Sequence, residues 1–306
     1  MKKDFFYASC GKGQIHACRW MPQAEPKAVL QIVHGIAEYI ERYEEFARYL
    51  NELGYIVVAE DHMGHGQSIG EEGVRGYFHG GWFSAVEDTY RLMQDTMEQY
   101  PQLPYVLFGH SMGSFMARTI LCKYPESGIT AAIICGTGWQ PKLALPALIK
   151  VVELMCKKNG EENPDEKLHK MIFGGYNDRI ENPRTDCDWL TCDERIVDAY
   201  NRDPLCGFVP ACGLLRDMMK GILYIEQQKN LENMKKHLPV LLIAGQEDPV
   251  GNYGKGVEQT AREMKKAGMV RLRTKLFPDC RHEILNERSR QEVYQYISSW
   301  LARHIG

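Results

Sequence analysis

The clearest chemical signal in the sequence is the pentapeptide Gly-His-Ser-Met-Gly at positions 109–113, which follows the apolar run Tyr-Val-Leu-Phe. A serine on a sharp turn between a strand and a helix presents its hydroxyl clear of the neighbouring backbone. Glycines two positions before and two positions after it remove the side chains that would clash there. We therefore interpret Ser111 as a nucleophile rather than as a serine that only caps a helix.

A serine hydroxyl is a weak nucleophile at neutral pH, so it needs a base and an acid that orients the base. With this kind of serine turn, the acid follows a later strand of the sheet and the histidine follows the last one. Asp248 lies shortly after the apolar run Val-Leu-Leu-Ile-Ala, and His282 follows the last predicted strand. These two residues complete the predicted triad, while Glu247 and Asp279 stay open as alternative acids.

Acyl transfer also requires two backbone N–H groups that stabilise the oxyanion formed on the carbonyl oxygen. One usually belongs to the residue after the nucleophile, here Met112, and the other to the loop after an early strand. That strand ends in His-Gly-Ile-Ala-Glu at 34–38, so the second predicted donor is the N–H of Ile36. Gly35 allows this loop to turn tightly.

These residues need a rigid scaffold, and the rest of the sequence predicts one. Short apolar runs alternate with amphipathic helical patterns, which indicates an α/β fold with a mostly parallel sheet and helices on both faces. The predicted strands are a hairpin at 5–8 and 14–20, followed by 28–34, 56–59, 105–108, 131–135, 240–244 and 270–277. The last strand alternates apolar residues with Arg and Lys, so we expect it at or near an edge of the sheet with one face in solvent.

The alternation is interrupted at residues 139–238, which contain a charge-rich stretch, several prolines and helical fragments. We interpret this segment as an insertion over the sheet, and residues 1–138 and 239–306 as the core. Apolar residues at helical spacing mark the start of the insertion: Leu143, Leu145, Leu148, Ile149, Val152 and Met155. This face either lines a cavity for an acyl chain or packs the insertion onto the core, and both interpretations stay open.

Together the motifs resemble the serine hydrolases of the monoacylglycerol lipase and lysophospholipase type, in the α/β-hydrolase superfamily. Besides 34–38 and 109–113, the matching segments are Asp-His-Met-Gly-His-Gly-Gln-Ser at 61–68, Gly-Gln-Glu-Asp-Pro-Val-Gly at 245–251 and Arg-His-Glu-Ile-Leu-Asn-Glu at 281–287. The resemblance implies an eight-stranded sheet, a helical cap formed by the insertion, and no cofactor or metal. One departure is Tyr39, where relatives commonly have histidine.

The resemblance and the predicted triad indicate hydrolysis of carboxylic esters of single-chain lipids, such as monoacylglycerols or lysophospholipids, through an acyl-enzyme on Ser111. Two alternatives stay open. An aminopeptidase-type amide hydrolase would need an acidic cluster for the substrate amine, and the insertion offers candidates at Glu161, Glu162, Asp165 and Glu166. A ligand-binding hydrolase fold without activity is disfavoured because every triad position is filled.

Composition and charge exclude several other classes of protein. The 306 residues carry a net charge of −3, which gives no basic field for nucleic acid, and 44% hydrophobic with 25% charged residues excludes a disordered chain. We find neither a signal-peptide pattern nor an apolar run long enough for a membrane span, so we expect a cytoplasmic protein. Ten cysteines fit that expectation as free thiols.

Asp61, His62 and His65 could suggest a metal, but the glycines around them favour a tight structural loop. The expected partners are therefore a small acyl ester substrate and, transiently, a membrane surface contacted through the cap. The sequence does not indicate an oligomeric state.

Overall fold

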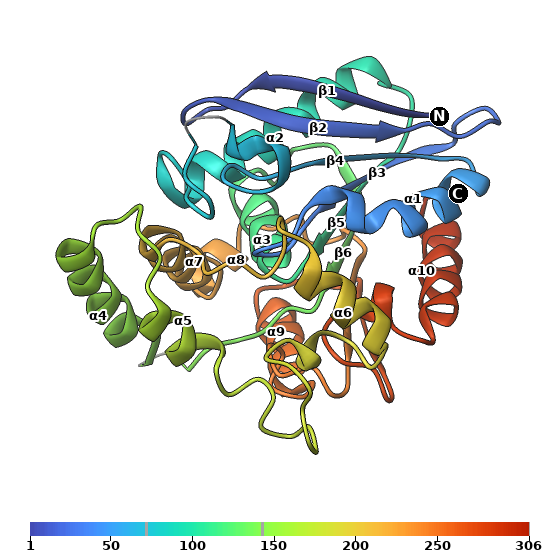
Figure 1. The fold of residues 1–306 in the computed structure, drawn as a ribbon. Helices are drawn as coiled ribbons and strands as arrows, with labels where there is room; N and C mark the ends of the chain where they lie inside the picture. The colour runs from blue at the N-terminus through green and yellow to red at the C-terminus, as the bar shows by residue number, and fades with distance from the viewer. Residues whose placement is uncertain (71–72, 142–143, 306) are drawn as a thin grey trace.

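The computed structural model describes residues 1–70, 73–141 and 144–305. Within them the chain forms an eight-stranded sheet in the order β1-β2-β4-β3-β5-β6-β7-β8 (Figure 1). The strands are β1 (Lys2–Ala8), β2 (Gln14–Trp20), β3 (Ala28–Val33), β4 (Tyr55–Glu60), β5 (Tyr105–His110), β6 (Ile129–Cys135), β7 (Val240–Gly245) and β8 (Leu272–Phe277). The β1–β2 and β2–β4 pairs are antiparallel and the other pairs are parallel. The predicted α/β class and N-terminal hairpin are thus confirmed.

The central strands are buried on both faces, whereas the last strand is not. All residues of β3, β4, β5 and β7 are buried, as expected of near-continuous apolar runs in a parallel sheet. β8 is an edge strand in which Arg273 is exposed and Phe277 is buried, so its predicted solvated face is confirmed. The strand begins at Leu272 rather than at Val270, which is 63% exposed.

Helices cover both faces of the sheet and complete two separate apolar cores. One core contains side chains of α1 (Glu44–Glu52) and α10 (Arg290–His304). The other contains side chains of α2 (Gly81–Gln99), α3 (Met112–Lys123) and α9 (Lys255–Lys266). Because the strands alternate their side chains between these two cores, the sheet is held from both sides and its carboxyl edge is a rigid platform.

The segment between β6 and β7 contains the remaining α-helices. These helices are α4 (Ala144–Asn159), α5 (Glu166–Phe173), α6 (Glu194–Arg202), α7 (Cys212–Ile225) and α8 (Gln228–Leu231). Figure 1 shows α4, α5, α7 and α8 on one side of the molecule and α6 apart from them. α4 lies at the outer edge of the molecule, beyond α7. Short 3₁₀ helices are found at Ile40–Tyr43, Gly66–Ile69, Asp188–Leu190 and Ile284–Asn286. In the described part of the chain, no helix combines the length and apolar character that crossing a membrane requires.

Candidate active site

Ser111 sits on a strained turn between β5 and α3. Its φ of 53° and ψ of −122° place it in a conformation that L residues rarely adopt. The turn is fixed by hydrogen bonds from the Ser111 N–H to the Cys135 carbonyl (3.0 Å) and from the Ser114 hydroxyl to the Ser111 carbonyl (2.6 Å). The side chain therefore stands at the carboxyl edge of the sheet, as the sequence predicts.

The two glycines of the pentapeptide are required by close backbone contacts. A Cβ on Gly109 would lie 2.4 Å from the Gly113 carbonyl oxygen. A Cβ on Gly113 would lie 2.0 Å from the carbonyl oxygen of Val33, at the end of β3. These positions let the serine turn pack directly under the loop that follows β3, which is where an oxyanion donor is expected.

His282 and Asp248 are brought together by the loops after β8 and β7. The Nδ1 of His282 lies 2.9 Å from Oδ1 of Asp248, and both side chains are almost fully buried. Asp248 also accepts the N–H of Val250 at 2.9 Å. Of the alternative acids, Glu247 and Asp279 are both exposed, and neither hydrogen-bonds to the histidine. The geometry thus favours Asp248 as the partner of His282.

Ser111 and His282 line the same pocket, but they are not hydrogen-bonded to each other. Among the described residues, the Nε2 of His282 has no hydrogen-bond partner. In a hydrolase without substrate the bond between nucleophile and base is often long and tightens only in the complex. Nε2 is therefore the ring nitrogen of His282 that has room for a further hydrogen bond.

The two residues predicted to supply oxyanion donors flank Ser111 in different ways. Ile36 lines the pocket together with Ser111, whereas Met112 follows Ser111 directly as the buried first residue of α3. Ala37, the residue after Ile36, has a φ of 54° that turns the loop sharply. The N–H of Gly35 donates to Oε1 of Glu38 at 2.6 Å and is thus occupied. This leaves the amide of Ile36 as the donor that this loop can offer.

A cluster of buried charges behind this loop was not recognised in the sequence. Glu38, Arg42, His110 and Glu283 are joined by hydrogen bonds and ion pairs between side chains that are at most 10% exposed. Two signals were present: Glu38 and Arg42 are one helical turn apart, and Glu283 directly follows His282. Neither signal shows that Arg42 contacts Glu283, because 241 residues separate them in the sequence.

The Asp61–His65 loop is held by structural hydrogen bonds. Asp61 accepts the backbone N–H groups of Ile40 and Gln67, both at 2.9 Å. The N–H of His62 donates to Nε2 of His34 at 3.0 Å, which keeps that ring nitrogen unprotonated. Within residues 1–70, 73–141 and 144–305, no group of three or more His, Cys, Asp or Glu side chains is arranged to hold a metal ion.

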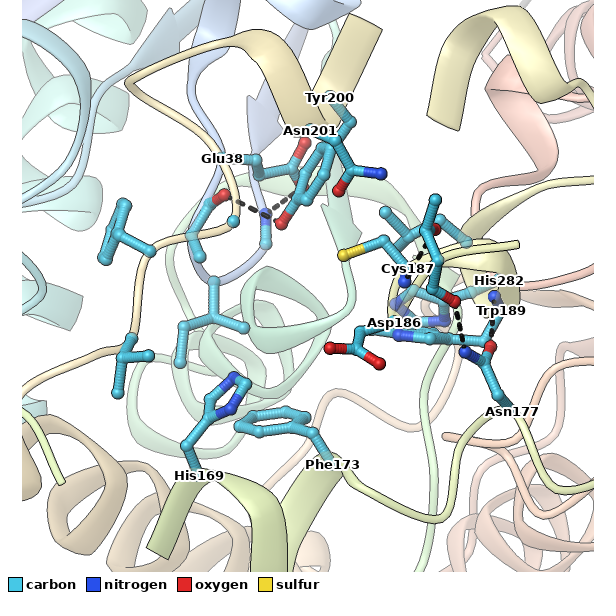
Figure 2. A pocket seen from close by; sticks show the side chains of 18 of the residues that line it. Glu38, His169, Phe173, Asn177, Asp186, Cys187, Trp189, Tyr200, Asn201 and His282 are labelled. Atoms are coloured by element: carbon cyan, nitrogen blue, oxygen red, sulfur yellow. Dashed lines mark hydrogen bonds between the residues drawn. The ribbon is translucent and has the colours of Figure 1, made fainter. Parts of the chain in front are cut away.

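A pocket with a volume of about 1060 Å³ opens above Ser111 and His282. Figure 2 shows His169 and Phe173 of α5 on one side of it, and Asp186, Cys187 and Trp189 on another. Its apolar lining includes Ile36, Leu190, Phe208, Val209 and Pro210. Its polar lining includes Lys167, Lys170, Asn177, Arg184, Asp186 and Asn201. The pocket is thus more polar than an acyl-chain cavity alone requires.

The apolar face predicted at the start of the insertion packs against the fold and does not line this pocket. Leu145, Ile149 and Val152 of α4 are buried in the larger apolar core, in which α7 takes part, and no residue of α4 borders the pocket. Leu143 lies outside the described residues. Of the two interpretations left open, the buried positions of α4 favour packing, and the sequence could not separate the two because an apolar helical face has the same pattern in both cases.

The acidic residues considered for binding an amine are used elsewhere. Glu161 pairs with Arg216, and Asp165 accepts the N–H of Leu168 at the start of α5 (3.0 Å). Glu162 is exposed, and of the four acids only Glu166 borders the pocket. They therefore form no carboxylate cluster that could hold a substrate amine.

The chain matches the model of the Hydrolase_4 family, described as serine aminopeptidase S33, over residues 24–289. It belongs to this family. Its relatives include a monoglyceride lipase of Homo sapiens, 44% identical over 77% of this chain and 70% of the relative. A monoacylglycerol lipase of Mycolicibacterium smegmatis is 26% identical over 99% of this chain and 98% of the relative.

A solved structure with the same fold is a thermostable carboxyl esterase of Bacillus coagulans in complex with glycerol. It is 32% identical, with a TM-score of 0.93 over 100% of this chain and 99% of the esterase. The predicted α/β-hydrolase fold and the resemblance to monoacylglycerol lipases are thus confirmed. Because its relatives include monoglyceride lipases and a carboxyl esterase, the chain is a carboxylic ester hydrolase.

Proposed function

We propose that this protein hydrolyses monoacylglycerols through an acyl-enzyme on Ser111, with His282 as general base and Asp248 as the acid that orients it. The observation that carries the proposal is one pocket that holds the strained serine, the unpartnered Nε2 of His282 and the loop of Ile36. This combination is what nucleophilic acyl transfer needs: a raised hydroxyl, a free base nitrogen and backbone donors.

The reaction proceeds in two halves. Ser111 Oγ attacks the ester carbonyl carbon while His282 Nε2 takes its proton, and the N–H groups of Ile36 and Met112 stabilise the oxyanion. The carbon–oxygen bond then breaks, and the proton passes from His282 to the leaving glycerol. In the second half His282 takes a proton from water, which attacks the acyl carbon. The bond between that carbon and Ser111 Oγ then breaks, His282 returns the proton to Oγ, and the fatty acid is released. Asp248, bonded to Nδ1, stabilises the imidazolium in both halves.

The lining of the pocket supports an amphiphilic substrate. Apolar side chains such as Phe173 and Phe208 suit an acyl chain, whereas Asn177, Asp186 and Asn201 offer hydrogen bonds to hydroxyl groups. The names of the relatives point to monoacylglycerol rather than lysophospholipid. We expect kcat/KM for a 1-monoacylglycerol to exceed that for a lysophospholipid with the same acyl chain by about tenfold or more. Equal values would remove the preference for glycerol esters.

The central test is the Ser111→Ala variant, assayed with monoacylglycerol and with p-nitrophenyl esters. Removing the nucleophile should lower kcat by on the order of 10⁶. A fluorophosphonate probe should label the wild-type protein and leave the variant unlabelled. Turnover of aminoacyl arylamides faster than that of esters would instead favour amide hydrolysis, the activity in the family description.

We further propose that residues 139–238 act as a cap that contacts a membrane containing anionic lipids. Val151 and Leu154 of α4 and Met171 of α5 are 46%, 67% and 53% exposed. The same two helices carry exposed lysines that form no ion pair within the described residues: Lys150, Lys157, Lys158, Lys167 and Lys170. Exposed apolar side chains and lysines on the same helices are typical of interfacial contact with anionic lipid.

Vesicle sedimentation tests this contact. Binding to vesicles with anionic lipid should exceed binding to zwitterionic vesicles and should fall in the Leu154→Asp variant. Equal sedimentation of wild type and variant would contradict the proposal, whatever the esterase activity.

A further inference from the structure

We infer that Arg42 is a positioning residue that connects the oxyanion loop to the loop of the general base. This inference rests on the proposed function, because it assigns Arg42 to the alignment of Ser111, His282 and the amide of Ile36. Arg42 does not border the pocket, so it acts through Glu38 and Glu283 rather than on the substrate.

The contacts of Arg42 join two loops that are far apart in the sequence. Its Nη1 donates to Glu38 Oε2 at 2.8 Å and to Glu283 Oε1 at 2.6 Å. Its Nη2 donates to Glu283 Oε2 at 2.7 Å, which completes a bidentate pair. Only the planar guanidinium fork can bridge two carboxylates in this way.

Each carboxylate in turn holds a part of the active site. Glu38 Oε1 accepts the N–H of Gly35 at 2.6 Å, and Gly35 is pressed between Glu38 and Ser111. A Cβ on Gly35 would lie 2.6 Å from Glu38 Oε1 and 3.1 Å from Ser111 Cβ. Glu283 directly follows His282 in the chain. A shift of either carboxylate therefore moves the Ile36 amide or the His282 ring relative to the serine.

His110 adds a third connection between the two loops. Its Nδ1 lies 3.2 Å from Glu38 Oε1, and its ring centroid lies 4.7 Å from that of His282. Burial alone would lower the pKa of His110, but its hydrogen bond to Glu38 raises it above the usual range. His110 therefore contacts Glu38 on one side and the ring of His282 on the other, while Arg42 supplies the positive charge that bridges the two carboxylates.

Because the cluster is buried, the charged state of Arg42 and those of Glu38 and Glu283 depend on one another. The side chain of Arg42 is 10% exposed, and those of Glu38 and Glu283 are 4% exposed. Burial opposes the charged state of Arg42, but Glu283 and Glu38 raise its pKa well above the usual range. Removing Arg42 would leave two carboxylates close together without a counter-charge, and they would separate or take up a proton. Either response changes the position of the loops.

The test compares Arg42→Ala, Arg42→Lys and the control Arg48→Ala. Arg48 lies on α1, is 73% exposed and, among the residues that the structure describes, pairs with Glu44 alone. Reacting sites are counted by fluorophosphonate titration, so that kcat refers to folded, labelled enzyme. We expect Arg42→Ala to lower kcat per site by about 10²-fold, the cost of a small misplacement of reacting groups. KM should stay close to the wild-type value, because Arg42 does not border the pocket.

Two further results separate positioning from general stability. Guanidinium ion added at low concentration should restore part of the kcat of Arg42→Ala, and Arg42→Lys should be intermediate. A kcat per site equal to that of the wild type, or a loss that appears only in KM, would overturn the inference. If Arg42→Ala does not fold, Glu283→Gln serves instead. It keeps the side-chain volume and should lower kcat about tenfold, since glutamine has one acceptor oxygen instead of two and one of the two hydrogen bonds from Arg42 is lost.

Failure of this inference differs from failure of the proposed function. If the wild type hydrolyses no ester and Ser111→Ala changes nothing, the proposed function is wrong. If Ser111→Ala is inactive and the Arg42 variants have full kcat per site, only the positioning role is wrong.

Discussion

The inserted segment has two parts that relate to the active site in different ways. The inner part, residues 184–208, is hydrogen-bonded to both active-site loops. The N–H of Glu283 donates to the Leu190 carbonyl at 2.7 Å, and the N–H of Gly207 donates to the Ala37 carbonyl at 3.0 Å. These hydrogen bonds therefore fix the inner part relative to the loop of His282 and to the loop of Ile36.

The outer part, residues 144–176, contacts the rest of the molecule mainly through α7. Salt bridges join Glu153 to Lys220 and Glu161 to Arg216, and both partners lie on α7. In the described part of the chain, it makes no hydrogen bond to the Ile36 loop or the His282 loop. Yet α5 supplies one wall of the pocket through His169 and Phe173.

This difference indicates that the inner part bears both on alignment of the reacting groups and on the substrate, because Asp186, Asn201 and Phe208 also line the pocket, whereas the outer part bears on the substrate alone. A change in the inner part should affect folding and kcat, because its hydrogen bonds end on catalytic loops. A change in the outer part should affect which ester is accepted, because it alters one pocket wall only. Matched pairs of variants, with one variant in each part, test this difference.

The largest contrast is expected for a pair of glutamates. Glu287, 1% exposed, accepts the N–H of Arg281 at 2.7 Å and that of Cys192 at 3.0 Å, so it connects the base loop to the inner part. Glu287→Ala leaves both amides without an acceptor and should lower the free energy of unfolding by about 3 kcal/mol. Glu166→Ala, on exposed α5, should change it by less than about 0.5 kcal/mol. Urea unfolding followed by tryptophan fluorescence measures both, and equal changes would contradict the comparison.

The next contrast concerns how the stability of the two parts depends on pH. The His65 ring lies 5.4 Å from that of Phe208 in the inner part, and burial, with the nearby His62, lowers the pKa of His65 to about 4. The unfolded chain, with a histidine pKa near 6.5, therefore binds more protons than the folded protein below that pH. Stability is fully present above pH 6.5 and falls as the pH approaches 4, by about 2 kcal/mol at pH 5.

The histidine of the outer part provides the control for this pH dependence. His65→Gln should flatten the stability–pH curve between pH 7 and 5. His169→Gln should flatten it less, because the partial burial that lowers the pKa of His169 is opposed by the nearby Glu166 and Asp186. Chemical unfolding at fixed pH values measures the curves. If the curve flattened only in the His169→Gln variant, the group that causes the loss of stability in acid would lie in the outer part.

The sequence predicted the elements whose signals are local. Strands such as β3 and β5 are continuous apolar runs, and Ser111 is flanked by glycines whose contacts are now visible. Asp248 and His282 could be placed because each follows a strand, and the carboxyl ends of parallel strands meet at one edge. The position of β8 at the sheet edge followed from its alternating pattern.

The sequence could not predict contacts that depend on how distant segments pack. Arg42 and Glu283 meet because the loop after β3 and the loop after β8 pack against each other. No periodic pattern in the sequence indicates that contact. The apolar face of α4 was ambiguous because burial against α7 and burial around an acyl chain select the same residues. The polar pocket wall at 183–190 was missed because it is irregular, so its residues carry no helical or strand spacing.

A smaller contrast is expected for a pair of tyrosines. The hydroxyl of Tyr200, in the inner part, donates to the Ala37 carbonyl at 3.0 Å, next to Ile36. Tyr200→Phe removes this bond and should cost about 1 kcal/mol of stability. Because Gly207 still holds the same carbonyl, kcat should fall only a few-fold. Tyr176→Phe in the outer part should leave kcat unchanged, which steady-state assays of both variants can test.

The smallest and most specific effect is expected at the pocket wall of α5. Phe173 borders the pocket and stacks on His169, with ring centroids 4.9 Å apart, but it contacts neither active-site loop through a hydrogen bond in the described structure. Phe173→Leu should change the ratio of kcat/KM for long and short acyl esters about threefold, because the smaller side chain keeps only part of the apolar contact with the chain. Since the inner part keeps Ser111 and His282 aligned, kcat for an acetate ester should stay within a factor of two. A parallel fall in acetate turnover would show that the outer wall also positions the reacting groups, and the separation of alignment from selectivity would fail.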